Sequence, residues 1–509
     1  MPQLEDYAQL PNSSWKLKEV GSRNNRDDGK REKLHTEVRQ SSFLETEHCI
    51  FEQIHDHNVS AFIQYYKSNG EIKSVTHVMQ DDVKVIPLNG EEIQLGAVKL
   101  PLGEAEYGDT LSLLKEVESH IHRYLDVSDS FRKFASYYVL LSWVYDRFST
   151  LPYLRFIGDT GCGKSRALDV CGGLCYKATS ASGCITPAPI YRMIKRWRGT
   201  MILDEADFKN SDEYNEVVTI LNCGFEKGRP VIRAVKENPD QVQILPVFGP
   251  KVFATRRRFK DPALEARCLT EIMQETVRGD IPSTLTSTFY KEQEALRNKL
   301  LLFRLRNYNR IDPEKSVTLE LHGIEPRLRQ ISACFGSLFA GNPDVLADYE
   351  AYIYHHQREL IEQRAATITG QVVEKLFSLK ESVTNVTNVT NDTTLIPVSS
   401  GDIAGKLGMT PQQVGQILKT LGLQTKPHKV EGTPKRCIIF DQVKLDTLKR
   451  RYVLIEDDDT VTKVTKVTKV TGLNTDDELP DCQKCGLNKW AMTLAGGYAC
   501  PCGHTLRAG

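Results

Sequence analysis

The chain lacks long apolar runs, an excess of either charge and a secretory signal pattern. No stretch of its 509 residues approaches the roughly 20 consecutive apolar residues that cross a bilayer. The first ten residues, MPQLEDYAQL, show no apolar signal-peptide core. We therefore expect a cytoplasmic protein without a membrane partner. Lys and Arg together number 66, as do Asp and Glu, so contact with nucleic acid must depend on local patches of charge.

The cysteines do not form a disulfide framework. Nine of the 13 are scattered singly, as in proteins of reducing compartments, and four cluster near the C-terminus. The sequence also contains no carboxylate cluster typical of nucleases, no acid pair typical of polymerases and no serine nucleophile elbow. These absences favour a reduced globular protein, and the length predicts about three to four domains.

Composition changes along the chain divide it into segments. Residues 1–42 are polar and we expect them to be disordered, whereas residues 43–108 alternate apolar and polar side chains, which predicts a small β-rich domain. Residues 109–280 begin with helical spacing and then alternate short strands with helices, the pattern of a parallel sheet covered by helices. We expect residues 281–381 to form a helical lid. The predicted fold class is α/β.

Two three-residue repeats indicate linkers. Val, Thr and Asn recur over residues 383–391, and Val, Thr and Lys recur over residues 461–471. A period of three matches neither the helix nor the strand, so neither repeat can turn one face to a core. The division that we predict for this part of the chain is linker 382–396, domain 397–455, linker 456–477 and domain 478–509.

A glycine-rich segment fits the phosphate-binding pattern G-x-x-x-x-G-K-[ST] at every position. An apolar run, YLRFI, precedes it as a strand, and a helix-like stretch follows. Its glycines let successive backbone N–H groups point at phosphates, while Lys164 would reach the terminal phosphates of ATP and Ser165 would bind Mg²⁺. The residues that we predict to hold the nucleotide are Gly158, Asp159, Thr160, Gly161, Cys162, Gly163, Lys164 and Ser165.

A second apolar run ends in two acids. Residues 200–203 predict a buried strand, and Asp204 and Glu205 follow at its carboxyl end, where ligands bind in such sheets. Asp204 would hold Mg²⁺ together with Ser165, and Glu205 would act as the catalytic acid that polarises the attacking water. The alternative is that both are ordinary surface acids at the end of a strand.

With these two motifs, the sequence resembles the AAA+ family of P-loop ATPases. Residues 251–256 resemble the sensor strand of that family, and the segment DPALEARC that follows resembles its arginine-finger helix. The resemblance places Thr255 or Arg256 at the sensor position, although the usual sensor Asn is absent. It places Arg267 at the position of the catalytic arginine finger, and Arg327 at the position of the nucleotide-contacting lid arginine called sensor 2.

An arginine finger is a cation that reaches the γ-phosphate held by a neighbouring subunit. The resemblance therefore implies a homo-oligomeric ring, most often a hexamer in this family. The alternatives are a salt bridge beneath the sheet for Arg267 and a solvated helix charge for Arg327.

Within the family, residues 135–340 resemble the helicase-like ATPases of plasmids, integrative elements and phages, and more distantly the minichromosome-maintenance helicases. The segments TPAPIYRMI, LNCGFEKGRPVIR and VFGPKVFATRRRFKDPALEARC carry this resemblance. It implies ATP and Mg²⁺ as cofactors, single-stranded DNA as a partner, and a primase or replication-initiation factor as a further partner.

A basic segment lies between the acidic strand and the sensor strand. Residues 224–233 contain Lys227, Arg229 and Arg233, which would grip DNA phosphates without reading bases if the segment faces a central pore. The alternative is an ordinary basic surface loop.

Residues 397–455 predict a helix-turn-helix followed by strands, the pattern of a winged helix. Thr410 and Pro411 form a helix start, and apolar residues on both helices share one face. Residues 397–453 carry ten Lys and Arg against four Asp and Glu, a formal charge of +6, which favours DNA over a protein partner. The side chains best placed to meet a groove are Gln412, Gln413, Gln416 and Lys419.

Residues 478–509 contain two cysteine pairs. The spacings Cys482-x-x-Cys485 and Cys500-Pro-Cys502 are typical of a zinc ribbon, and a segment of about 30 residues needs a metal or disulfides to fold. We predict that Zn²⁺ is bound by the first three cysteines, with Cys502 favoured over His504 as the fourth ligand.

These motifs support three functions. The first is an ATP-dependent DNA helicase or translocase that serves the replication of a mobile element or phage. The second is an AAA+ regulator or remodeller of protein partners, and the third is a DNA-binding defence ATPase. A positively charged pore lining favours the helicase, whereas an apolar or aromatic pore loop favours protein remodelling.

Overall fold

The computed structural model divides the chain into two compact units, Met1–Ile455 and Glu456–Gly509, and each is described by itself. Among the described residues, no helix is long and apolar enough to cross a membrane. The residues that the structure describes are 37–56, 58–181, 186–204, 212–235, 238–313, 319, 321–382, 387–390, 393–430, 433–440, 442–453, 491–492, 497–499 and 505–507.

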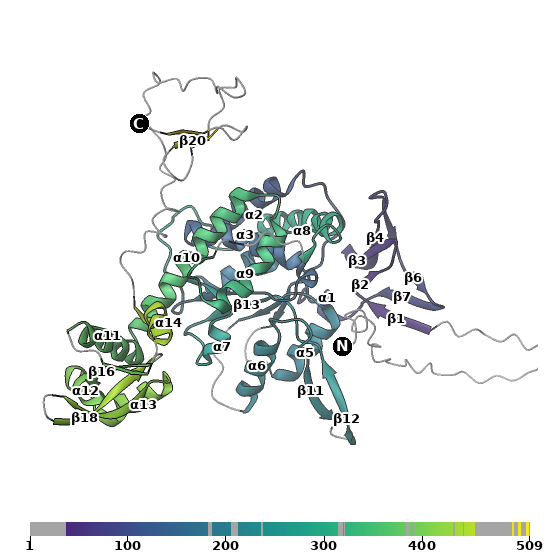
Figure 1. The fold of residues 1–509 in the computed structure, drawn as a ribbon. Coiled ribbons are helices and arrows are strands. Elements are labelled where there is room, and N and C mark those ends of the chain that lie inside the picture. The colour runs from purple at the N-terminus through teal and green to yellow at the C-terminus, as the bar shows by residue number, and fades with distance from the viewer. Residues whose placement is uncertain are drawn as a thin grey trace, which may run out of the picture. The chain divides into compact units, whose positions relative to one another are not determined.

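A five-stranded parallel sheet forms the centre of the first unit (Figure 1). Every residue of its two middle strands β8 and β13 is buried, as expected for a sheet covered on both faces. The chain passes from β8 to the far edge of the sheet, returns to β13, and then crosses β8 to reach β14, which places a crevice at the carboxyl ends of β8 and β13. The strands, in spatial order, are β14 (Cys268–Ile272), β8 (Tyr153–Ile157), β13 (Lys251–Thr255), β10 (Met201–Leu203) and β9 (Thr179–Ala181).

Helices pack around this sheet, and the helical character predicted for the start of residues 109–280 and for residues 281–381 is present in the structure. Asp109 and Ser128 accept hydrogen bonds from backbone N–H groups at the starts of α2 and α3, which fixes where these helices begin. The helical segments are α2 (Thr110–Tyr124), α3 (Asp129–Trp143), η2 (Tyr145–Arg147), α4 (Lys164–Val170), η3 (Gly172–Leu174), α5 (Pro187–Trp197), α6 (Asp212–Cys223), α7 (Pro262–Glu265), α8 (Ser287–Asn307), α9 (Pro326–Leu338) and α10 (Pro343–Ala365).

The N-terminal β region, residues 37–87, forms two small sheets. A turn joins its fourth and fifth strands, with Gly70 at a φ of 74°. One sheet has the order β1 (Glu37–Ser41), β7 (Val83–Pro87), β6 (Val78–Gln80), and the other has the order β2 (Phe43–Glu45), β3 (Cys49–Asp56), β4 (Val59–Tyr66), β5 (Ile72–Val75). A short helix, α1 (Glu91–Gln94), follows.

The strand β3 faces two different cores. Phe51 lies with Phe62 of β4 in a small core between the two sheets. Ile50 and Ile54, on the opposite face, belong to the main core that surrounds the parallel sheet. We predicted a separate domain over residues 43–108, but the inner face of this region is part of the main core.

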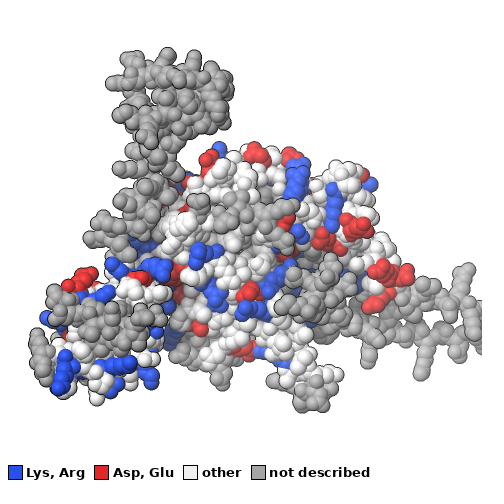
Figure 2. All heavy atoms as spheres, in the orientation of Figure 1, with Lys and Arg blue, Asp and Glu red and all other residues white. Residues whose placement is uncertain are grey.

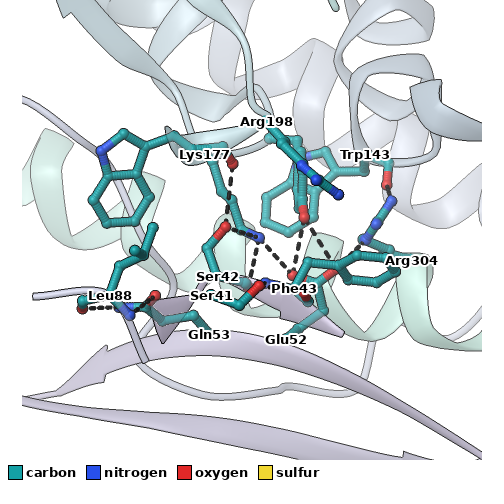
Figure 3. Close-up of polar contacts among 12 residues, drawn as sticks. Ser41, Ser42, Phe43, Glu52, Gln53, Leu88, Trp143, Lys177, Arg198 and Arg304 are labelled. Carbon is teal, nitrogen blue, oxygen red and sulfur yellow. Dashed lines mark hydrogen bonds and ion pairs between the residues drawn. The ribbon is translucent and has the colours of Figure 1, made fainter. Parts of the chain in front are cut away.

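A buried group of charges joins the N-terminal β region to the parallel sheet and to α8 (Figure 3). The carboxylate of Glu52, on β3, accepts hydrogen bonds from Lys177 at 3.0 Å, from the Tyr176 hydroxyl at 3.0 Å and from Arg304 Nε. Arg304 also donates to both carboxylate oxygens of Asp146 at 2.8 Å. Two acids and two bases therefore balance inside the core, where an unpaired charge would be costly.

A second core lies in the C-terminal module, which we define as residues 368–452. Buried side chains of its helices and of two strands pack together in a cluster of their own. Its helices are α11 (Ile368–Glu381), α12 (Ser400–Leu407), α13 (Pro411–Thr420) and α14 (Gln442–Tyr452). Its sheet has the order β15 (Thr387–Thr390), β16 (Thr393–Ser399), β18 (Thr433–Phe440), β17 (Gln424–Val430).

Two boundaries of the C-terminal module differ from the prediction. We assigned residues through 381 to the lid, but Val372, Val373 and Leu376 of α11 pack into the core of this module. We also predicted a linker over 382–396, but part of that segment forms β15 and pairs with β16. An edge strand needs only backbone pairing and β-branched residues, so a three-residue period does not prevent it.

In the second unit the structure describes three short strands in one antiparallel sheet. Their order is β19 (Ala491–Met492), β20 (Gly497–Ala499), β21 (Thr505–Arg507). The predicted zinc ligands lie outside the described residues, so Zn²⁺ binding stays a prediction; they are Cys482, Cys485, Cys500 and Cys502, with His504 as the alternative.

Candidate functional site

The loop between β8 and α4 has the geometry of a phosphate cradle. Gly161 and Gly163 both have a φ of 89°, in the left-handed region that favours glycine. A Cβ added to Gly158 would lie 2.7 Å from Cys162 Sγ and from the carbonyl oxygen of Met273. Each of the three glycines of the motif therefore meets a steric requirement of this loop.

Lys164 and Ser165, the first two residues of α4, line a cavity of about 310 Å³ at the carboxyl edge of the sheet, which we call the carboxyl-edge cavity. Lys164 Nζ donates to the carbonyl oxygen of Asp159 at 2.6 Å, an acceptor that a phosphate oxygen can replace. The other residues that line the cavity are Thr160, Gly161, Gly163, Arg166, Asp204, Ala254, Thr255 and Arg256.

Two oxygen groups from different elements meet in this cavity. Ser165 Oγ donates to Asp204 Oδ2 at 2.9 Å, and Asp204 directly follows β10. A hydroxyl and a carboxylate are ligands that suit Mg²⁺, so this pair fits the metal that the sequence predicts. Glu205, the predicted catalytic acid, lies outside the described residues.

Both candidates for the sensor position line the carboxyl-edge cavity. Thr255, the last residue of β13, is 1% exposed, and its hydroxyl has no hydrogen-bond partner in the described part of the chain. Buried polar groups are nearly always hydrogen-bonded, so a hydroxyl in a cavity wall is suited to contact a ligand. Arg256 is exposed at the same wall.

Arg166 also lines the cavity, and sequence reasoning did not single it out. Its guanidinium donates to the carbonyl oxygens of Pro282 and Ser283 at 2.5 Å each, which ties α4 to the segment before α8. Its place directly after Ser165 is the signal that could have identified it.

Arg267 and Arg327 lie at the opposite, amino edge of the sheet. Arg267 directly precedes β14, whose first residue pairs with Tyr153, the first residue of β8. Both guanidinium groups lie over the ring of Phe225, with Cζ at 4.2 Å and 5.0 Å from its centroid. Arg267 is 6% exposed and donates to Asn222 Oδ1 at 2.8 Å. Burial, together with the charge of Arg327, lowers the pKa of Arg267.

The structure therefore does not bring these two arginines to the cavity of their own chain. It brings them instead to each other, on the aromatic ring of Phe225, to which the sequence analysis gave no role. Phe225 and Asn222 come from the end of α6 and the turn after it, and only the folded chain shows that they hold Arg267.

The predicted basic segment leads into a β-hairpin of β11 (Val231–Val235) and β12 (Asn238–Leu245), which projects from the sheet (Figure 1). Lys227 is exposed and donates to a backbone carbonyl, and Arg229 is 64% exposed with an ion pair to Glu226 at 3.0 Å. Arg233 instead packs against Tyr191 and pairs with Glu216, so its charge is engaged within the chain.

One face of this hairpin is apolar and exposed. Ile232 pairs with Ile244 across the strands, and Val242 lies on the same face two residues away. The three side chains are 61%, 40% and 63% exposed, respectively. Neighbouring exposed apolar side chains on a projecting element are typical of a contact surface.

All four predicted contact residues of α13 are exposed, namely Gln412, Gln413, Gln416 and Lys419. Gln413 is also engaged within the chain, because its Oε1 accepts hydrogen bonds from the N–H and hydroxyl of Thr410 and completes a capping box. Lys and Arg side chains gather on the surface of the C-terminal module, at the lower left of Figure 2.

No family model matches the chain, and no curated protein matches it. One similar solved structure is the SCCmec type IV Cch active helicase, at 11% identity and a TM-score of 0.42, with 82% of each chain covered. The apo C-terminal region of NrS-1 has 13% identity and a TM-score of 0.35, covering 76% of this chain and 95% of that chain. The JCV helicase has 14% identity and a TM-score of 0.23, covering 49% and 66%. Similarity at these TM-scores does not support a functional assignment. The function proposed below is therefore argued from the geometry of the site.

Proposed function

We propose that this chain is an ATP hydrolase that binds ATP and Mg²⁺ in the carboxyl-edge cavity. The hydrogen bond between Ser165 Oγ and Asp204 Oδ2 is the observation that carries the proposal, because it joins a complete phosphate-loop motif to an acidic strand end. Lys164 would contact the terminal phosphates, and bound Mg²⁺ would neutralise charge on them.

The remaining catalytic roles follow from position. Thr255, with its buried hydroxyl, and Arg256 line the wall of the cavity and would contact the γ-phosphate. Glu205 directly follows Asp204 in the sequence, and our proposal gives it the role of orienting the attacking water.

We further propose that copies of the chain assemble into a ring, most often hexameric in the family that the sequence resembles. Arg267 lies at the amino edge, about one strand length from its own cavity, so a catalytic role for this residue requires the cavity of a neighbouring copy. Arg327 lies beside it on Phe225, which favours a role at the same interface rather than the contact of a lid arginine with the nucleotide that the resemblance implies.

The action that we propose is that of a DNA helicase or translocase. The formal charge of +6 over residues 397–453 and the exposed Gln412, Gln416 and Lys419 support a DNA-binding winged helix. The predicted zinc ribbon would add a second contact. Replication of a mobile element or phage, with a primase or initiation factor as partner, is the setting that the sequence resemblance favours.

The test is ATP hydrolysis by the purified chain with and without single-stranded DNA. We expect DNA to stimulate hydrolysis several-fold, and Lys164→Ala to abolish it under both conditions because the phosphates lose their main cation. Lys115→Ala, at an exposed position on α2, is the matched control and should behave as the wild type. Hydrolysis that depends on Lys164 but ignores DNA would contradict the helicase and leave the ATPase standing.

A second candidate function has one observation in its favour. The exposed apolar face formed by Ile232, Val242 and Ile244 suits a protein partner better than a phosphate backbone. If the chain remodels proteins, Ile232→Ser together with Val242→Ser should abolish stimulation by the partner and leave basal hydrolysis intact. If it is a helicase whose hairpin only borders DNA, the same variant should retain DNA-stimulated hydrolysis.

A further inference from the structure

The carboxylate of Glu265 joins three parts of the chain behind the carboxyl-edge cavity. Glu265 is the last residue of α7, and both of its oxygens accept hydrogen bonds from Arg155 at 2.5 Å. Arg258 donates to the same carboxylate at 2.5 Å, and the backbone N–H of Phe259 donates at 3.1 Å. One acid therefore holds the strand β8, the segment after β13 and the helix α7 together.

The Glu265 carboxylate is shared by two cations, Arg155 and Arg258. Arg155 is fully buried in the middle of the sheet, where its Nε also donates to the Thr270 hydroxyl at 3.0 Å. Burial acts to raise the pKa of the Glu265 carboxyl, but Arg155 and Arg258 hold that pKa below its usual range. The carboxylate is therefore charged at neutral pH and is shared by two cations. Arg155 alone would be enough to balance the charge of Glu265, so the contact with Arg258 calls for another explanation.

The second cation, Arg258, lies in the chain just after two residues that line the cavity. Arg258 and Phe259 follow Thr255 and Arg256 by three residues each, and the latter two line the carboxyl-edge cavity. The ring of Phe259 also lies under the Arg155 guanidinium, with Cζ at 5.2 Å from the centroid. A shift of the cavity wall would therefore pull on the Glu265 carboxylate through both a side chain and a backbone hydrogen bond.

The first residues of α7 are connected to Arg267 through hydrogen bonds of Asn222. The side chain of Asp261 caps the start of α7 through Leu264 N at 2.7 Å and accepts a hydrogen bond from Asn222 Nδ2 at 3.3 Å. Asn222 Oδ1 in turn accepts from Arg267 Nη1 at 2.8 Å. With only one residue between Glu265 and Arg267, the orientation of the short helix α7 sets where the arginine lies.

We propose that Glu265 is a positioning residue that links the cavity wall of one subunit to the Arg267 that the same subunit presents to its neighbour. The wall residues contact the nucleotide of the subunit itself, and Arg267 acts on the nucleotide of the next. Glu265 joins the two, so the state of one cavity sets the geometry of the arginine at the adjacent one. This role rests on the proposed ATPase and on its assembly into a ring.

Mixing of inactive variants tests this role. At ATP concentrations that fill its weakened cavity, Lys164→Ala cannot hydrolyse ATP but keeps Glu265 and Arg267 intact, whereas Glu265→Gln has an intact cavity but a misplaced arginine. We expect Glu265→Gln alone to lower kcat about 10²-fold, with KM for ATP within about twofold of the wild type, because misplacement by an ångström costs that much. Mixed with Lys164→Ala, it should regain hydrolysis, since random assembly restores roughly a quarter of the interfaces.

Two further mixtures separate the possible failures. Arg267→Ala mixed with Lys164→Ala tests the ring itself, and we expect it to regain activity in the same way. If that mixture recovers but Glu265→Gln with Lys164→Ala does not, Glu265 serves only its own cavity and our inference is wrong. If neither mixture recovers, while Lys164-dependent hydrolysis is present in the wild type, the ring and the role of Glu265 are both overturned.

Arg258→Met covers the case in which Glu265→Gln fails to fold. It removes the ion pair between Arg258 and Glu265 and leaves the Phe259 N–H hydrogen bond and the buried Arg155–Glu265 pair intact. We expect the same lowered kcat at unchanged KM, and the same recovery on mixing with Lys164→Ala. Wild-type kcat in Arg258→Met, with an unchanged melting temperature, would overturn the inference.

Discussion

The N-terminal β region and the C-terminal module are both small, sheet-containing parts of the first unit, but their apolar faces lie in different cores. Ile50 and Ile54 of β3 pack into the main core around the parallel sheet, and Glu52 between them joins a buried ion network. The apolar side chains of the C-terminal module instead pack against one another. The N-terminal β region therefore shares the core of the parallel sheet, whereas we expect the C-terminal module, with its separate core, to unfold on its own.

The largest effect should come from breaking the ion network. Glu52→Gln leaves Arg304 and Lys177 buried with one acid between them, and we expect a loss of about 3–5 kcal/mol in the free energy of unfolding. Denaturant unfolding followed by circular dichroism measures this loss, and hydrolysis of ATP should fall in parallel. Glu47→Gln, at a side chain that is 88% exposed, is the control. Equal stability of the two variants would show that the buried ion network does not contribute to the stability of the fold.

The C-terminal module should unfold independently of the main core. Leu418 is 1% exposed on α13, and Leu418→Ala should cost about 2–5 kcal/mol through the cavity that it leaves. We expect a separate, earlier unfolding transition, loss of DNA binding and normal basal ATP hydrolysis. Val443→Ala, at a position that is 75% exposed, should change none of these. A single transition in which hydrolysis is lost together with the module would contradict the division into two cores.

The stability that the buried ion network gives to the N-terminal β region should also depend on pH. Burial lowers the pKa of Lys177 from 10.5 to about 8, with the charge of Glu52 opposing the shift. Between these values the folded chain binds fewer protons than the unfolded chain, so the free energy of unfolding rises with pH, by at most about 1.4 kcal/mol per unit. Below pH 8 both states are protonated and the dependence disappears.

Lys177→Met removes this titration, so the difference in stability between wild type and variant should widen in favour of the wild type as the pH rises above 8. Lys115→Met, at an exposed lysine, should show no such widening. The separate transition of the C-terminal module should not share the slope. A difference that stays constant with pH would mean that Lys177 keeps its ordinary pKa in the fold.

The smallest effect is expected at the cap of α13. The Thr410 hydroxyl accepts a hydrogen bond from Gln413 N, and the Thr410 N–H donates one to Gln413 Oε1, so Thr410→Ala should cost the C-terminal module about 1 kcal/mol. Thr410→Ser keeps the hydroxyl and should restore the stability. Only the transition of the C-terminal module should move, and a shift of the main transition would mean that the two cores are coupled.

The parts of the site that were predictable lie in contiguous motifs. The phosphate loop, the strand ahead of it and the acid at the end of β10 are each local patterns, and the fold brings Ser165 and Asp204 together as their chemistry requires. The contacts of Arg267 were not predictable. Asn222 and Phe225 lie more than 40 residues earlier in the chain, in a segment whose sequence does not indicate a contact with Arg267, so only packing reveals this role.

Contacts between residues that are far apart in the sequence also explain the errors in the predicted fold. The members of the ion network, Glu52, Asp146, Lys177 and Arg304, are far apart in the sequence, so nothing local showed that the N-terminal β region shares the main core. The strand β15 was missed because its repeat has no apolar face, although an edge strand does not need one.

The central claim is that the loop of residues 158–165 binds ATP with Mg²⁺, and calorimetric titration of Mg²⁺–ATP into the purified chain tests it most directly. We expect saturable binding by the wild type and by Lys115→Ala, and binding at least about tenfold weaker by Lys164→Ala, a loss of about 1.4 kcal/mol or more. Equal affinity in the wild type and Lys164→Ala would place the nucleotide elsewhere and contradict the account.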